Sequence, residues 1–270
     1  MKRRQRCGSS IKAVLRPHLA SISSYYLRFS QVRARTAGER MDEGSSQGDR
    51  GESIYRGGAV IELALAKNYV AEYVDSDDAH YACELKRSGE GRPGLCDLEL
   101  TSQSWQGITW IHRVRVLIPK GASRPYVVLM VTGSGDGREE LALCGEISRL
   151  TGMAVAILHD VPNQPLFGNL HEDALMAYTF AKYLEGGAWD WPLLLPMTKS
   201  VVKAMDAVEL LYEKITGTAA SGFIVTGASK RGWTSWLSAI VDRRIKGIAP
   251  MVYDNLNLHV QMRHQRECYG

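Results

Sequence analysis

The residue best placed to do covalent chemistry is a serine between a short apolar run and an amphipathic segment. The sequence from Phe223 to Gly232 reads FIVTGASKRG, so Ser229 follows an apolar run and two small residues, Gly227 and Ala228. A nucleophile elbow needs this arrangement, because the backbone of the serine is strained and its close neighbours must be small. The pattern predicts that the Ser229 hydroxyl projects above the carboxyl edge of a sheet and attacks an ester or amide carbonyl carbon.

The match to the usual G-x-S-x-G pattern is incomplete. Arg231 stands where the second glycine is usual, and Gly232 follows one residue later. The alternative interpretation is an ordinary strand-to-helix turn in which Ser229 caps the helix N-terminus. At the level of the sequence both interpretations stay open.

Two cations follow the serine at the start of the expected helix. Lys230 and Arg231 oppose the helix dipole there, at a cost of ~0.3–1 kcal/mol each when exposed. A local rule broken at a candidate site is a hint of function, so one hypothesis is that a cation assists the oxyanion or binds a substrate carboxylate. The alternative is that Arg231 ties the elbow to a neighbouring acidic residue or loop carbonyl.

A glycine-rich segment is the candidate for the rest of the oxyanion site. Residues 132–137 read TGSGDG and follow the apolar run 126–131. In hydrolase sheets one oxyanion N–H belongs to the residue after the nucleophile, here Lys230, and another to the loop after an earlier strand. The expected loop donors are the backbone N–H groups of Gly133, Ser134 and Gly135. A phosphate-cradling turn is the alternative, but no G-x-G-x-x-G pattern follows.

The acid and the base of a triad are less well placed. In this fold they follow the serine in the order acid, then histidine, and Asp254 comes just after an apolar segment, where it could be the acid or a helix cap. His259 and His264 fall on an expected helix, residues 256–266, rather than on a loop. We therefore expect the catalytic histidine to lie beyond Gly270 and the chain as given to have little or no hydrolase activity. His159 and His171 could line the site, but they precede the serine.

The surrounding pattern predicts an α/β fold with a mostly parallel sheet covered by helices on both faces. Two antiparallel strands, 96–100 and 108–118, are joined by a turn at Gln106-Gly107. Buried strands are then expected at 126–131, 153–158, 223–225 and 245–251, with helices between them. The apolar residues expected on the buried faces of three of these helices are Leu143, Cys144, Ile147 and Leu150, then Val201, Met205, Val208, Tyr212 and Ile215, then Trp233, Trp236, Leu237 and Ile240.

Composition restricts the classes of function. The first 38 residues contain nine Lys and Arg and no Asp or Glu, while the net charge of the whole chain is only +4. The remainder is slightly acidic, so a nucleic-acid-binding surface is not indicated. Residues 1–57 are interpreted as a basic leader and linker and residues 58–270 as the hydrolase-like domain, whose C-terminal strands are expected to be missing. A mitochondrial transit peptide is the alternative for the leader, since no signal-peptide apolar region is readable, and no segment is apolar enough to span a membrane.

The sequence contains no metal-type or cofactor motif. The five cysteines are scattered, and free thiols are expected, although Cys83 and Cys96 flank a glycine-rich hairpin and could pair if the protein is secreted. Asn163 and Gln164 follow the strand expected at 153–158. They are expected either to orient the substrate or to stabilise their own loop.

Several long motifs closely resemble the PhoPQ-activated pathogenicity-related protein family. They are VPNQPL at 161–166, WPLLLPMTKS at 191–200, GASKRGWT at 227–234, VDRRI at 241–245 and NLN at 255–257. The resemblance covers roughly residues 68–270. It implies an α/β-hydrolase-like domain that is usually exported or secreted, and some eukaryotic relatives carry the name autocrine proliferation repressor. The elbow is also similar to that of glucuronoyl esterases, in which a basic residue follows the serine.

Two functions from different classes follow. The first is a serine hydrolase that acts on a small-molecule or peptide ester or amide without a cofactor. The second is a secreted signalling or binding protein that uses the hydrolase fold without catalysis and has a receptor partner. The reactivity of Ser229 discriminates between them, because a binding module needs no activated hydroxyl.

Overall fold

The computed structural model describes residues 68–88, 94–122, 124–253 and 257–269. Residues 67–254 form one compact unit, and helix α9 (Leu258–Tyr269) belongs to another. The leader and linker predicted for residues 1–57 lie outside the described residues. Among the described helices, none combines the length and the apolar character that a membrane crossing requires.

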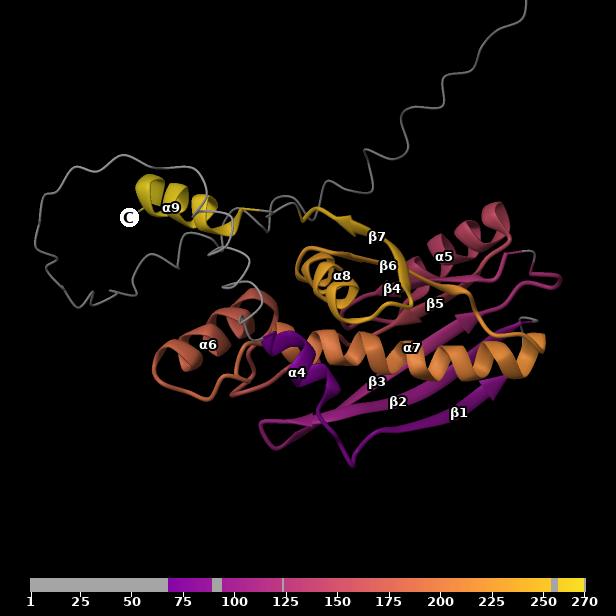
Figure 1. Ribbon diagram of the computed structural model, residues 1–270, viewed down its shortest axis with the longest axis horizontal. Helices are drawn as coiled ribbons and strands as arrows, with labels where there is room; N and C mark the ends of the chain where they lie inside the picture. The colour runs from indigo at the N-terminus through magenta and orange to yellow at the C-terminus, as the bar shows by residue number, and fades with distance from the viewer. Residues whose placement is uncertain (1–67, 89–93, 123, 254–256, 270) are drawn as a thin grey trace, which may run out of the picture. The chain divides into compact units, whose positions relative to one another are not determined.

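A seven-stranded sheet is the centre of the larger unit, with the strand order β1-β2-β3-β5-β4-β6-β7 (Figure 1). The first three strands and β5 pair antiparallel, whereas β5, β4, β6 and β7 pair parallel. This is the α/β-hydrolase-like sheet that the sequence predicts. The strands are β1 (Ala82–Ser88), β2 (Leu95–Trp105), β3 (Ile108–Leu117), β4 (Tyr126–Val131), β5 (Ala154–Leu158), β6 (Gly222–Ala228) and β7 (Ile245–Met251).

The hairpin between β2 and β3 turns where the sequence predicts it. Trp105 pairs with Ile108, so only Gln106 and Gly107 form the loop. Both loop residues have positive φ, 51° and 74°, as a two-residue turn that matches the strand twist requires. The cysteines on this side of the sheet are not opposite each other: Cys83 pairs with Leu100 and Cys96 with Ser88. Both are free thiols.

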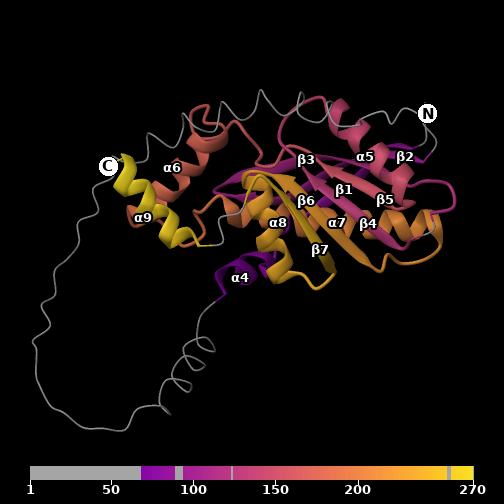
Figure 2. The ribbon, with the colours of Figure 1, turned by 90° about the horizontal axis from the view of Figure 1, so that it is seen from above.

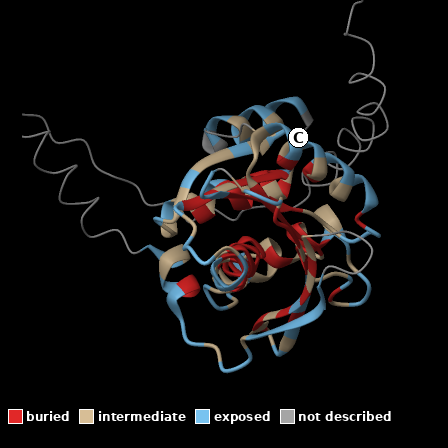
Figure 3. Cartoon of the chain, turned by 90° about the vertical axis from the view of Figure 1, so that its right-hand side faces the viewer, coloured by how far each residue is buried: buried red, intermediate tan, exposed pale blue. Residues whose placement is uncertain are grey.

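Helices cover the two faces of the sheet unequally. Helix α5 (Arg138–Thr151) lies on one face, and α7 (Leu194–Thr216) and α8 (Lys230–Val241) lie on the other (Figure 2). Alternate residues of a strand point to opposite faces, so Val128 of β4 packs with Cys144 of α5, while Leu129 belongs to the larger cluster that includes α7. The buried residues concentrate in the strands and in α7 (Figure 3). The remaining helices of this unit are α4 (Tyr69–Asp75) and α6 (Glu172–Leu184).

The apolar face predicted for helix α8 is buried only in part: Trp233 and Leu237 pack against the main core cluster, but the other two predicted residues are exposed. Thr234, Ser235 and Ser238 are fully buried, and each hydroxyl donates to the carbonyl oxygen four residues earlier. Trp236 and Ile240 are exposed, Ile240 by 66%. The small side chains satisfy their own polar groups within the helix, so they can face the protein interior. On α5, too, Leu143 and Leu150 are exposed rather than buried.

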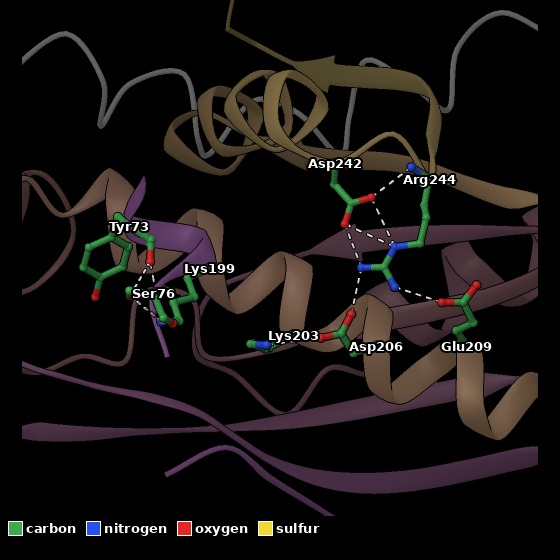
Figure 4. A network of polar contacts seen from close by, with 8 residues as sticks. All are labelled: Tyr73, Ser76, Lys199, Lys203, Asp206, Glu209, Asp242 and Arg244. Atoms are coloured by element: carbon green, nitrogen blue, oxygen red, sulfur yellow. Dashed lines mark hydrogen bonds and ion pairs between the residues drawn. The ribbon is translucent and has the colours of Figure 1, made fainter. Parts of the chain in front are cut away.

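A line of polar contacts ties α7 to its neighbours (Figure 4). The buried Lys199 donates from Nζ to the carbonyl oxygen of Ser76 at 2.7 Å, just past the end of α4. Farther along α7, Asp206 and Glu209 pair with Arg244, which precedes β7 and also pairs with Asp242. The three ion pairs span 2.7 to 2.8 Å. These contacts hold α4 at one end of α7, and the start of β7 at the other.

Candidate active site

Ser229 lies on a sharp turn between β6 and α8. Its backbone has φ 56° and ψ −122°, a combination that is strained for any residue but glycine. The hydroxyl makes no cap to the helix that follows, and no hydrogen bond to it is recorded among the described residues. The side chain is half-buried. An ordinary N-cap explains neither the strain nor the unused hydroxyl, so the geometry favours the elbow interpretation of this turn.

The two glycines beside the serine are explained by close backbone contacts. A Cβ at Gly227 would lie 2.7 Å from Cβ of Arg231 and 2.9 Å from its carbonyl oxygen. A Cβ at Gly232 would lie 3.0 Å from Cβ of Tyr253 and 3.2 Å from the carbonyl oxygen of Met251. The second glycine is therefore needed where α8 crosses the end of β7. This accounts for its place at 232, one residue later than usual.

The glycine-rich loop after β4 lies beside the elbow. Val131 pairs with Gly227, so Gly133 and Ser229 are each two residues past the same rung of the sheet. Arg113 donates to the carbonyl oxygen of Gly135 and Arg115 to that of Asp136. Asp160 donates its N–H to the carbonyl oxygen of Gly133 at 3.1 Å. These contacts use the carbonyl groups of the loop.

The backbone N–H groups of the expected oxyanion donors have no recorded acceptor among the described residues. For Gly133, Ser134 and Gly135, no hydrogen bond from the N–H group is recorded within the described residues. The N–H of Lys230 lies in the first turn of α8, where it has no acceptor inside the helix. Ser134 and Gly135 are exposed and Gly133 is half-buried.

The two cations after the serine are held by acidic residues. Arg231 donates from Nη1 and Nη2 to the two carboxylate oxygens of Glu172, at 2.8 and 2.7 Å, and from Nε to the carbonyl oxygen of Val161 at 2.6 Å. Lys230 Nζ contacts the same carboxylate and Asp173 Oδ1. The side chains of Lys230 and Arg231 are only 7% and 11% exposed. The contacts of Arg231 are those of the second interpretation, in which it ties the elbow to an acidic residue and a loop carbonyl.

The charge of Glu172 is stabilised by these partners. Burial raises the pKa of its carboxyl group, but hydrogen bonds and charge attraction from Arg231, and then from Lys230, outweigh burial and lower the pKa to about 2. The carboxylate is therefore ionised throughout the neutral range. Two cations and one shared carboxylate, with Asp173 at its edge, balance the charge at the N-terminus of α8.

Asn163 and Gln164 are both engaged within the protein. Asn163 Nδ2 donates to the carbonyl oxygen of Ile111 at 2.7 Å. Gln164 donates to Glu172 Oε1 at 2.6 Å and accepts from the Glu172 N–H at 2.8 Å. Of the two roles that the sequence allows for them, these contacts describe the stabilisation of the loop.

The structure describes only some of the candidate residues for the acid and the base. Asp254 lies outside the described residues, and the same holds for the side chain of His259. His264 lies on α9, where its ring is 3.6 Å from Sγ of Cys268. His171 is exposed and 3.4 Å from Asn169. The ring of His159 is buried against Gly137, with no partner recorded for either ring nitrogen within the described residues. No hydrogen bond between Ser229 and the ring of His159 or His171 is recorded among the described residues.

Glu172 is the site residue that the sequence does not single out. It is the first residue of α6, far along the chain from the elbow. The one signal that points to it is the pair of cations on α8, which calls for an acidic partner without saying which.

Solved structures with similar folds are esterases. An acetyl xylan esterase from a Thermoanaerobacterium species is 16% identical with a TM-score of 0.45, over 72% of this chain and 61% of that chain. An acetyl xylan esterase from a Paenibacillus species is 16% identical with a TM-score of 0.43, over 74% and 65%. A glucuronoyl esterase from Solibacter usitatus is 12% identical with a TM-score of 0.42, over 67% and 57%. Similarities this distant do not bear on the substrate.

A sequence relative is much closer. Autocrine proliferation repressor protein A of Dictyostelium discoideum is 38% identical in an alignment of 219 residues, and the match covers 74% of this chain and 44% of the relative. The chain therefore spans less than half the length of that protein. The profile of the PhoPQ-activated pathogenicity-related proteins matches residues 70–270. This match covers most of the chain, which thus belongs to the PhoPQ-activated pathogenicity-related protein family.

Proposed function

We propose that the protein is a serine hydrolase of the esterase or amidase type, with Ser229 as the nucleophile. The observation that carries the proposal is the backbone of Ser229, which is strained at φ 56° and ψ −122° on a strand-to-helix turn. Strain of this kind persists where the surrounding structure fixes it, and it is concentrated at functional sites. The Ser229 hydroxyl, for which no hydrogen bond is recorded among the described residues, adds to this support.

In the proposed reaction, Oγ of Ser229 attacks the carbonyl carbon of an ester or amide and gives its proton to a general base. The carbonyl oxygen becomes an oxyanion, which would accept hydrogen bonds from the N–H groups of Lys230 and of residues 133–135. The alcohol or amine then leaves with a proton, and water hydrolyses the acyl-serine. Asp254, which follows Tyr253 past the end of β7, is the proposed acid.

Asn163, Gln164 and Arg231 are the residues that the sequence suggests for substrate binding. Each donates to a protein acceptor within the described residues, so we propose that they shape the site instead of contacting the substrate. A small-molecule or peptide ester or amide is the proposed substrate class. No cofactor is needed for this chemistry.

The test is labelling with a fluorophosphonate probe, which reacts with activated serines. A form of the protein that continues past Gly270 is expected to label, and the chain as given is expected to label little or not at all. In the form that labels, Ser229→Ala is expected to abolish the labelling, and Ser221→Ala, which removes an exposed serine just before β6, is expected to leave it unchanged. If the chain labels, His259→Ala and His264→Ala show whether either supplies the base. If only a form of the protein that continues past Gly270 labels, the base lies there.

A second function has one specific observation in its favour. The relative that is 38% identical is named a proliferation repressor, which suggests secreted signalling or binding with a receptor and no catalysis. A folded protein that never labels at Ser229, in the shorter or the longer form, would favour this function over hydrolysis.

A further inference from the structure

Three segments from distant parts of the chain meet at the carboxylate of Glu172. Arg231 and Lys230 reach it from α8, Gln164 reaches it from the loop before α6, and Gly133 approaches it from the loop after β4. Two of these segments, the start of α8 and the Gly133 loop, carry the donors of the proposed oxyanion site. The relative position of those donors therefore depends on what holds the segments together.

The Gly133 loop packs against the guanidinium group of Arg231. A Cβ at residue 133 would lie 2.6 Å from Nη2 of Arg231 and 3.6 Å from Oε1 of Glu172. The loop backbone is thus in direct contact with the ion pair. Arg231 cannot rotate away while both its terminal nitrogens donate to Glu172 and its Nε donates to Val161, because a paired guanidinium has a fixed planar geometry.

Glu172 is itself held in an uncommon conformation. Its φ is 47°, in the left-handed region that a residue with a Cβ seldom adopts. Gln164 fixes it on two sides, because it accepts from the Glu172 N–H at 2.8 Å and donates to Oε1 at 2.6 Å. A strained residue held by this many partners is a rigid anchor rather than a passive surface charge.

The same carboxylate also settles the charge of the elbow helix. Lys230 and Arg231 stand at the positive end of the α8 dipole, where cations are unfavourable; Lys230 is buried, and the Arg231 side chain is only 11% exposed. Without Glu172, Arg231 would lose the only carboxylate recorded as its partner within the described residues. Lys230 would keep only Asp173. The first turn of α8, which holds the Lys230 N–H, would then be destabilised.

We propose that Glu172 is a positioning residue of the active site, which sets the Lys230 N–H and the Gly133 loop at the separation that an oxyanion requires. The proposal rests on the proposed hydrolase function. Glu172 touches neither the serine hydroxyl nor the substrate in this role, and it acts through Arg231 and Lys230.

The test compares Glu172→Gln with Asp173→Asn in the full chain. Both variants remove one negative charge at the start of α6, but within the described part of the chain the one ion pair recorded for Asp173 is with Lys230. The rate constant for phosphonylation of Ser229 is expected to fall roughly tenfold to a hundredfold in Glu172→Gln, since small misplacements of catalytic groups have effects of this size, and to stay within about twofold in Asp173→Asn. A Glu172→Gln protein that keeps its circular dichroism spectrum and reacts at the wild-type rate would overturn the proposal.

A spectroscopic readout separates positioning from stability. In the phosphonylated protein the phosphoryl oxygen occupies the oxyanion site, so its ³¹P chemical shift is expected to move in Glu172→Gln and not in Asp173→Asn. Unchanged shifts in both variants would mean that Glu172 only stabilises the fold.

Hydrogen–deuterium exchange tests the anchor even where the hydrolase function fails. If the wild-type chain does not react with the probe, faster amide exchange at 133–137 and 229–233 in Glu172→Gln alone would still support an anchor at Glu172. Equal exchange in the two variants would overturn it. A wild-type protein that reacts neither in this form nor in one that continues past Gly270, with the anchor intact, counts against the hydrolase function and not against the anchor.

Discussion

The backbone N–H of Ser229 donates to the carbonyl oxygen of Met251 across 2.9 Å. The strained turn is thereby fixed to the end of β7, the neighbouring strand. This hydrogen bond uses the N–H of the serine itself, which leaves the N–H of Lys230 as the donor at the start of α8. The elbow is therefore shaped by β6, β7 and α8. Substitutions where these elements meet should change the stability of the protein measurably.

Gly227→Ala is expected to destabilise the protein by about 1–3 kcal/mol, as overpacking of a filled site does. The added methyl would lie 2.7 Å from Cβ of Arg231 and 2.9 Å from its backbone carbonyl carbon and oxygen. Gly247→Ala is the matched control on the paired strand, because its Cβ would meet only Ile224 at an ordinary 3.9 Å. Urea unfolding of both variants checks this; equal midpoints would contradict it.

Glu172→Gln is expected to lower the free energy of unfolding by about 1–3 kcal/mol at pH 7, less than for a fully buried pair because the Glu172 side chain is 43% exposed. The folded-state pKa of Glu172 is lowered, to about 2, so its contribution is fully present above the unfolded pKa near 4.5 and is lost as the pH falls toward 2. The difference between wild type and variant should therefore shrink between pH 5 and pH 2. A difference that stays constant over this range would argue against the ion pairs as its source.

His112 should make the protein less stable in mild acid. Burial lowers its pKa to about 4, although contacts with the carbonyl oxygens of His159 and Asp160 act in the opposite direction. The unfolded chain binds the proton first, near pH 6.5, so stability falls as the pH drops from 6.5 to 4, by roughly 2–3 kcal/mol. His112→Gln should lose this part of the pH dependence in urea unfolding measured at pH 7 and pH 5. The same slope in both proteins would show that another group is responsible.

Arg244→Gln is expected to cost about 1–2 kcal/mol, because it leaves Asp206, Glu209 and Asp242 without their shared cation. The difference in stability between the wild-type protein and Arg244→Gln should be larger at low salt, because the charges are less screened there. Lys246→Gln, two residues along on an exposed side chain, is the control and should change the thermal midpoint little. Similar thermal midpoints for the two variants would show that Arg244 does not stabilise the contact between α7 and β7.

Much of the fold could be predicted from the sequence because its signals are local. The apolar runs that become β4 to β7, the Gln106-Gly107 turn and the strand–serine–helix order each lie within a few residues. The most deeply buried residues of α8 could not be predicted from apolar periodicity, because they are Thr234, Ser235 and Ser238, whose hydroxyls donate to carbonyl oxygens inside the helix. Hydrophobicity alone assigns such residues to solvent.

The backbone motifs of the candidate site could be predicted from the sequence, but the partner of its two cations could not. The serine, its glycines and the TGSGDG loop are contiguous motifs with a known geometry. The partner of the two cations is set by the tertiary fold, because Glu172 lies 59 residues before Arg231. The sequence shows that a counter-charge is needed, but only the folding of the 161–172 loop onto α8 shows which residue supplies it.

The bidentate contact between Glu172 and Arg231 also has an evolutionary consequence. A change at one of the two positions leaves the other charge without this partner, so single changes should be selected against while paired changes are tolerated. In an alignment of the family, positions 172 and 231 are therefore expected to covary. Relatives with the usual glycine at position 231 should be released from the need for an acidic residue at 172.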